Sequence, residues 1–169
     1  HDIKPALKRK NIVIVGAGPG GLEAARVSAE RGHKVTVLEA QPNPGGQVRL
    51  TARNPRRKEM ISIIDWRMSQ CAVRDVVCYF NAYATAEDVI KLRPDVVIIA
   101  TGGLPNLELY ESGRDQELVI SAWDLISGDK LPGQNVLIYD ESGDHPGLMA
   151  AEVAANAGAI IEVMTPDRI

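Results

Sequence analysis

The sequence predicts an α/β protein built around a parallel β-sheet. Two observations lead to this class: short apolar runs rich in β-branched residues recur along the chain, and stretches with helical periodicity separate them. The clearest case is residues 11–39, where a strand, a helix and a second strand follow one another. Such a β-α-β unit forms a right-handed crossover between parallel strands. A second unit of this kind starts at residue 135.

Each element has its own local signal. The run at 11–15 is too short for a helix, and Gly32 follows a stretch of helix formers as a helix-ending residue would. Proline and glycine cluster in 40–57, which predicts an exposed loop, and 104–134 reads as a mixed connector. The predicted strands are 11–15, 35–38, 76–80, 96–100, 135–139 and 160–164, and the predicted helices are 22–31, 59–70, 86–92 and 148–157.

Composition excludes several classes of function. With 19 basic and 22 acidic residues the net charge is −3, and 4% of residues are aromatic, so the chain lacks the basic surface and the stacking platform of a nucleic-acid-binding protein. Its longest apolar run, 96–100, is far shorter than the roughly 20 residues of a membrane span. Two cysteines, Cys71 and Cys78, make no disulfide framework. We therefore expect a cytoplasmic protein whose partners include no nucleic acid and no membrane.

A glycine-rich turn between the first strand and the first helix is the candidate ligand-binding motif. It reads Gly16-Ala17-Gly18-Pro19-Gly20-Gly21 and contains the spacing G-x-G-x-x-G. The first motif glycine allows a tight turn, the second lets the backbone approach a pyrophosphate, and the third permits close packing of helix and strand. Free N–H groups at the start of the helix would face the diphosphate. We expect this site to include Gly16, Gly18, Pro19, Gly20 and Gly21.

Glu39 completes the pattern because it ends the second strand, 18 residues after Gly21. A carboxylate there can accept hydrogen bonds from the hydroxyls of an adenosine ribose, and it would repel a 2′-phosphate. The site should therefore prefer FAD, NAD or ADP to NADP. A Walker A phosphate loop is excluded, since Leu22 and Glu23 follow Gly21 in place of Lys and Ser or Thr. The Tyr-x-x-x-Lys signature of short-chain dehydrogenases is absent as well.

Two further segments separate FAD sites from NAD sites. The second strand leads into Glu39-Ala40-Gln41-Pro42-Asn43-Pro44-Gly45-Gly46-Gln47, and a later strand ends in Ala100-Thr101-Gly102. With the glycine turn, these segments resemble the flavoproteins that have two dinucleotide-binding domains. The resemblance implies a Rossmann-like parallel sheet, with the Gly-Gly-Gln loop and the Ala-Thr-Gly strand end beside the FAD diphosphate and ribityl chain. The cofactor-binding residues that it adds are Ala40, Gln41, Gly45, Gly46, Gln47, Ala100, Thr101, Gly102, and Ala82 near the adenine.

The second β-α-β unit departs from the first at its turn. After strand 135–139 the turn keeps only Gly143 and Gly147 and carries acids at 140, 141 and 144, which argues against a nicotinamide cofactor there. This turn and the first domain together resemble the C-terminal region of the trimethylamine, dimethylamine and histamine dehydrogenases. N-methyl amino acid demethylases and 2,4-dienoyl-CoA reductase are similar to this family.

The resemblance implies a flavin-dependent oxidoreductase whose substrate chemistry takes place outside this chain. Members of the family have an N-terminal (β/α)₈ barrel with FMN and a [4Fe–4S] cluster, followed by a domain that binds FAD or ADP. Two cysteines cannot supply the four thiolates of such a cluster. We expect FMN and the cluster only in a preceding part of the protein, and no catalytic or metal-binding residue in this chain. Expected partners are that barrel domain and an electron-transfer protein, and the isolated fragment should be inactive.

These elements divide the chain into a linker (1–10), a FAD- or ADP-binding Rossmann-like domain (11–117), a connector (118–134) and the first β-α-β unit of a second nucleotide-binding-like domain (135–169). The chain starts at His1 without an initiator Met and stops soon after its last strand, so we expect a piece of a longer protein. Three other functions stay open: a structural module with redox-inactive ADP, part of an NAD(P)H-dependent enoyl reductase of the 2,4-dienoyl-CoA type, and a self-contained NAD dehydrogenase.

Overall fold

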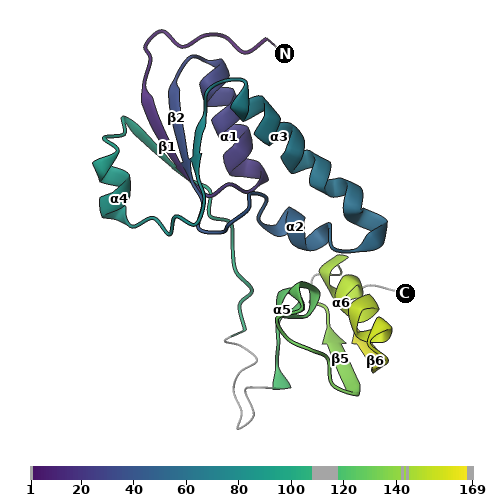
Figure 1. Cartoon of the computed structure of the whole chain (residues 1–169). Coiled ribbons are helices and arrows are strands. Elements are labelled where there is room, and N and C mark those ends of the chain that lie inside the picture. The colour runs from purple at the N-terminus through teal and green to yellow at the C-terminus, as the bar shows by residue number, and fades with distance from the viewer. Residues whose placement is uncertain (1, 108–117, 142, 144, 167–169) are drawn as a thin grey trace. The chain divides into compact units, whose positions relative to one another are not determined.

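The computed structural model describes residues 2–107, 118–141, 143 and 145–166. Its contacts divide the chain into two compact units: the first comprises His1–Ala52 and Arg56–Gly103, and the second comprises Arg53–Pro55 and Leu104–Ile169. Figure 1 shows the elements of both units. Within the described residues, no helix has the length and hydrophobicity needed to cross a bilayer. The domain limits inferred from the sequence stay a prediction.

A four-stranded parallel sheet forms the centre of the first unit. Its strands lie in the order β3-β2-β1-β4, with bounds Val77–Tyr79, Lys34–Leu38, Asn11–Val15 and Val96–Ile99 respectively. All three neighbouring pairs are parallel, which confirms the α/β class and the Rossmann-like sheet. Because parallel strands bring their carboxyl ends to one edge of the sheet, the turns that follow β1, β2 and β4 meet there.

Helices cover both faces of this sheet. The first unit contains α1 (Pro19–Glu30), α2 (Gln47–Thr51), α3 (Ser62–Ala72) and α4 (Ala86–Lys91). Ile14 of β1 packs against Leu22 of α1 and Ile64 of α3, all at most 1% exposed, and Figure 1 shows α1 and α3 side by side. Val13 points the opposite way and packs with Val89 of α4, as the two-residue period of a strand requires.

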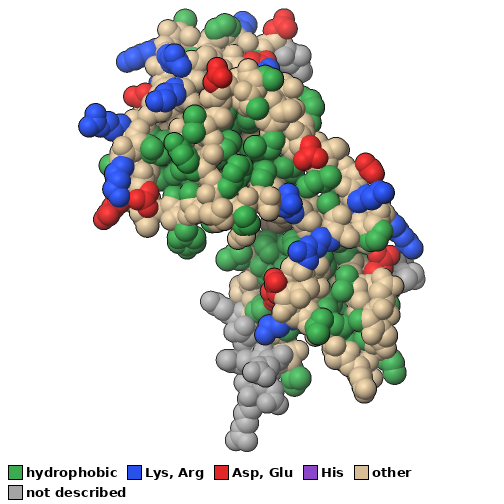
Figure 2. Space-filling view, in the orientation of Figure 1, with side chains coloured by type: hydrophobic (Ala, Val, Ile, Leu, Met, Phe, Trp, Pro, Cys, Tyr) green, Lys and Arg blue, Asp and Glu red, His purple; other side chains and the backbone are tan. Residues whose placement is uncertain are grey.

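On the face of the sheet that α4 packs against, the edge strand β4 is only partly covered by helices. Its residues Val97 and Ile99, which pair with Val13 and Val15 of β1, are 41% and 69% exposed. Figure 2 shows hydrophobic side chains gathered at the surface of this unit. The α1–α3 side is closed, and there burial raises the pKa of the Cys71 thiol.

The segment predicted to be a loop, 40–57, is in part helical, and this expectation was wrong. It contains α2, and a 3₁₀ helix, Pro55–Ile61, begins before the segment ends. The helix predicted at 59–70 is correspondingly divided between the 3₁₀ helix and α3. The physical reason is that Pro55 opens a helical turn, a position where its missing N–H costs nothing, so a residue interpreted as a turn former marks a helix start.

The described residues of the second unit form two parallel strands and two helices. β5 (Asn135–Tyr139) and β6 (Ile160–Met164) have the predicted bounds, and α6 (His145–Asn156) begins three residues earlier than predicted. Ile138 of β5 packs against Ala150 and Ala154 of α6. The predicted connector contains an additional helix, α5 (Ala122–Ser127), which starts with a reciprocal capping box between Ser121 and Asp124.

Candidate nucleotide-binding site

The glycine-rich turn connects β1 to α1 and lies tightly against β4. Gly16 has φ +103°, and a Cβ built on it would lie 2.3 Å from the carbonyl oxygen of Ala100. A Cβ on Gly21 would lie 2.0 Å from the carbonyl oxygen of Gly16. Neither position has room for a side chain, so both glycines are required for the packing of strand, turn and helix, as the motif predicts.

The other two glycines of the turn face open space. No atom lies within 4 Å of a Cβ placed on Gly18 or Gly20. Gly18 is the N-cap of α1, no side chain caps this end of the helix, and Pro19 occupies the first turn. The first turn of α1 therefore presents backbone N–H groups and the positive end of the helix dipole to an approaching anion.

The Gly-Gly-Gln loop lies directly beside this turn. The Gly45 N–H donates to the carbonyl oxygen of Ala17 at 2.8 Å, and a Cβ on Gly46 would lie 3.6 Å from the Cα of Gly18. Positive φ angles of +126° at Gly45 and +50° at Gly46 explain why two glycines stand here. Gln47 begins α2 and is exposed. The structure thus brings together two loops that are separated by some 25 residues of sequence.

The carboxylate of Glu39 connects the glycine turn to the end of β2. Its Oε2 accepts a hydrogen bond from the Ala17 N–H at 2.7 Å and its Oε1 accepts one from the Gln41 N–H at 2.8 Å, while the residue is only 8% exposed. Each carboxylate oxygen can accept a further bond, so the group can still receive ribose hydroxyls. The bond to Ala17 has no signature in the sequence; it follows from the pairing of β1 with β2.

An open depression of about 230 Å³ lies next to Glu39 in the first unit. The Ala82 N–H donates to the carbonyl oxygen of Glu39 at 2.8 Å, so the chain at 82 runs beside the predicted ribose site. Sequence reasoning named Ala82 as a neighbour of the adenine, but it missed several residues that line the depression, whose contribution depends on tertiary packing. The lining residues are Leu38, Tyr79, Ala82, Tyr83, Ala84, Asp88 and Leu92.

The Ala-Thr-Gly segment follows β4 at the same sheet edge. The Ala100 N–H donates to the carbonyl oxygen of Val15 at 2.8 Å and extends the β1–β4 ladder by one bond. Thr101 and Gly102 follow and are exposed, and Gly102 has φ +74°. Ala40 is exposed as well. The cofactor contacts assigned to these residues stay predictions.

The corresponding turn of the second unit is built differently. Asp140 follows β5 and is 8% exposed; its Oδ1 accepts a bond from the Gly143 N–H at 3.1 Å, and its Oδ2 accepts one from the Thr165 hydroxyl at 3.4 Å. A Cβ on Gly147, in the first turn of α6, would lie 2.8 Å from the Asp140 Cγ. A carboxylate of the chain itself therefore lies at the start of this helix. Asp144 lies outside the described residues.

Comparisons with known proteins fit this geometry. Residues 14–70 match the family of NAD(P)-binding Rossmann-like domains. The chain is 62% identical to the "Probable N-methylproline demethylase" of Rhizobium meliloti, over 99% of this chain and 24% of that protein. It is 43% identical to the N,N-dimethylglycine/sarcosine dehydrogenase of Chromohalobacter salexigens, over 99% of this chain and 25% of that protein.

A solved structure has the same fold. Histamine dehydrogenase from Rhizobium sp. 4-9 superposes with a TM-score of 0.85 at 30% identity, over 97% of this chain and 27% of the dehydrogenase. The chain thus spans about a quarter of the length of the relatives that it matches. Over nearly its whole length, the chain is homologous to a part of these demethylases and amine dehydrogenases.

Proposed function

We propose that this chain is the dinucleotide-binding part of a flavin-dependent oxidoreductase, and that it holds the ADP half of FAD, or ADP itself. One observation carries the proposal: the Glu39 carboxylate is hydrogen-bonded to the Ala17 N–H inside the glycine turn. The predicted ribose acceptor and the predicted pyrophosphate cradle are therefore held in one arrangement before a ligand arrives. Such preorganisation lowers the entropic cost of binding.

The residues present fit the ADP moiety in three places. Gly18 and Gly46 leave room for a diphosphate at the start of α1, Glu39 can receive the ribose hydroxyls, and the depression beside Ala82 suits an adenine. The role of this chain is to bind the nucleotide and to orient it. When bound, FAD would supply the capacity to accept and pass on electrons.

For the whole protein we propose an amine or N-methyl amino acid dehydrogenase or demethylase. The names of the N-methylproline and dimethylglycine relatives support this substrate class, and the family resemblance supports FMN and [4Fe–4S] chemistry in a barrel domain outside this chain. That barrel and an electron-transfer protein are the proposed partners, and a reducing cytoplasm is the proposed compartment. Part of an NAD(P)H-dependent enoyl reductase is less well supported, because Asp140 would repel a phosphate at the start of α6.

The proposal is tested by titrating the purified chain with ADP in a calorimeter. The Gly18→Val variant should lose ADP binding, since its side chain would fill the open space in front of α1 without meeting protein atoms. Gly133→Val in the second unit is the matched control, because a Cβ there meets only one atom, at 3.9 Å. Retained ADP affinity in Gly18→Val would refute the site. Visible flavin bands in the protein as purified indicate FAD, and an adenine-only extract indicates a redox-inactive ADP module.

A further inference from the structure

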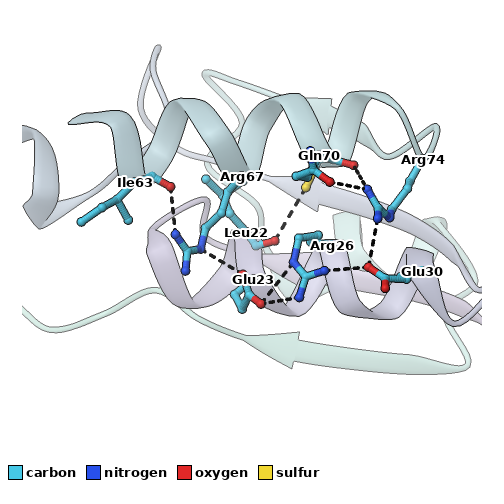
Figure 3. Close-up of polar contacts among 9 residues, drawn as sticks. Leu22, Glu23, Arg26, Glu30, Ile63, Arg67, Gln70 and Arg74 are labelled. Carbon is cyan, nitrogen blue, oxygen red and sulfur yellow. Dashed lines mark hydrogen bonds and ion pairs between the residues drawn. The ribbon is translucent and has the colours of Figure 1, made fainter. Parts of the chain in front are cut away.

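Five charged side chains connect α1 to α3 (Figure 3). Arg67 Nε of α3 lies 3.0 Å from Glu23 Oε2 of α1. Beyond the end of α3, Arg74 Nη2 lies 3.0 Å from Glu30 Oε2, at the end of α1. Arg26 joins the two steps within α1, since its guanidinium lies 2.7 Å from Glu23 Oε1 and 2.6 Å from Glu30 Oε2. We call these five residues the charge ladder.

The spacing of the charge ladder selects one register between the two helices. Glu23 and Glu30 stand seven residues apart on α1, and Arg67 of α3 and Arg74, in the turn that follows α3, have the same spacing. The two ion pairs therefore form together when the helices run in the same direction. Sliding α3 along α1 by one turn would separate both pairs at once. The apolar contacts between the helices are non-directional and discriminate less between registers.

The charge ladder is partly shielded from water. Arg26 and Arg67 are 14% and 24% exposed, and the ring of Trp66 lies within 5.6 Å of the first guanidinium and 5.7 Å of the second. Such cation–π contacts strengthen as they lose solvent. Hydrogen bonding by Arg26, together with the charges of Arg26 and Arg67, lowers the pKa of Glu23 against the opposing effect of burial, so this acid is ionised at neutral pH.

The two helices that the charge ladder joins each support one side of the nucleotide site. α1 begins at the glycine turn, and α3 reaches the Gly-Gly-Gln loop through Ile64, whose Cγ1 lies 3.2 Å from the position of a Cβ on Gly45. The Gly45 N–H in turn donates to Ala17 of the glycine turn. A displacement of α3 along α1 would therefore move Ile64 relative to Gly45, next to the bond that joins the two glycine loops.

We propose that the charge ladder is a positioning device for pyrophosphate: it keeps Gly45 and Gly46 against the glycine turn, and so sets the affinity for the diphosphate of the bound nucleotide. This inference rests on the proposed function. Its residues act through the backbone and touch no ligand. Partly exposed ion pairs such as these contribute little to stability individually, so the effect should appear in phosphate affinity while the fold is retained.

The test compares ADP with adenosine in wild-type protein and in Arg67→Gln and Arg74→Gln. Arg31→Gln is the matched control, because Arg31 ends α1 and is exposed. Loss of either ion pair between α1 and the arginines should weaken ADP binding about fivefold, which is the size of effect seen for residues that act on a site without contacting the ligand. Adenosine binding should change little, because no residue of the charge ladder contacts Glu39 or lines the adenine depression. Arg67→Lys, which keeps the charge but not the guanidinium that lies over Trp66, should lose less ADP affinity than Arg67→Gln.

A second measurement needs no ligand. Hydrogen exchange of the Gly45 amide should be faster in both glutamine variants than in wild type and in Arg31→Gln, because its bond to Ala17 would open more often. Unchanged Gly45 exchange overturns the positioning role. Equal weakening of ADP and adenosine overturns it too, since that pattern reports a general loss of structure. If wild-type protein binds no ADP, the proposed function fails, and Gly45 exchange alone then decides the positioning role.

Discussion

Replacing Glu39 should destabilise the protein even when no nucleotide is bound. In Glu39→Ala the Ala17 N–H, in a fully buried residue, loses its acceptor, whereas the Gln41 N–H belongs to an exposed residue and can bind water. An unsatisfied buried donor costs about 1–3 kcal/mol. We therefore expect the free energy of unfolding to fall by about 2 kcal/mol. Glu39→Gln keeps one acceptor oxygen but turns an amide N–H toward the other donor, so about half of that loss should remain.

Urea unfolding followed by tryptophan fluorescence measures this effect. In a Trp123→Phe background, Trp66 of α3 is the remaining tryptophan, so the signal reports the first unit. Glu59→Ala, which removes an exposed carboxylate, is the control. If Glu39→Ala unfolds at the same urea concentration as Glu59→Ala, the carboxylate does not hold the glycine turn, and the preorganised site is refuted.

Two further predictions concern the same unit. Gly21→Ala should cost about 3 kcal/mol and lower the melting temperature, because its Cβ would lie 2.0 Å from the Gly16 carbonyl oxygen and backbone must move; a melting temperature equal to that of wild type would contradict the packing described. Hydrogen bonds from Thr85 and Lys91 lower the pKa of Asp88 from 3.8 to about 2. Its folded pKa is depressed, so its stabilising effect is present above pH 3.8 and is lost as the pH falls through about 2. Wild type and Asp88→Asn should therefore differ in stability at neutral pH and converge in acid, and a carboxyl NMR titration of Asp88 with an ordinary midpoint would contradict this.

The features predicted best are those that depend on residues close together in the sequence. The strands at 11–15, 135–139 and 160–164 were predicted with their observed bounds, since short β-branched runs have few alternatives. The helices α2 and α5 were missed because each is short and is bordered by proline, glycine or serine, residues that also mark turns.

Contacts between distant segments could not be predicted from local patterns. The bond from Ala17 to Glu39 depends on which strands become neighbours. The pairing of Arg67 and Arg74 with the acids of α1 depends likewise on which helices do. Glu23 and Glu30, and likewise Arg67 and Arg74, are seven residues apart in the sequence, but this spacing indicates ion pairs only once α1 and α3 are known to lie side by side.

The carboxylate of Asp140 has a consequence for how stability responds to ligand concentration. Because the start of α6 already has a negative group from its own chain, the second unit needs no external anion to balance its helix dipole. The first turn of α1 has no acidic residue and no side-chain cap, and under the proposed function a nucleotide would take that position. A ligand that binds only the folded state stabilises it by RT ln(1 + [L]/Kd). The nucleotide would therefore stabilise only the first unit. In calorimetry, the melting temperature of the first unit would rise with ADP concentration, and that of the second unit would not change.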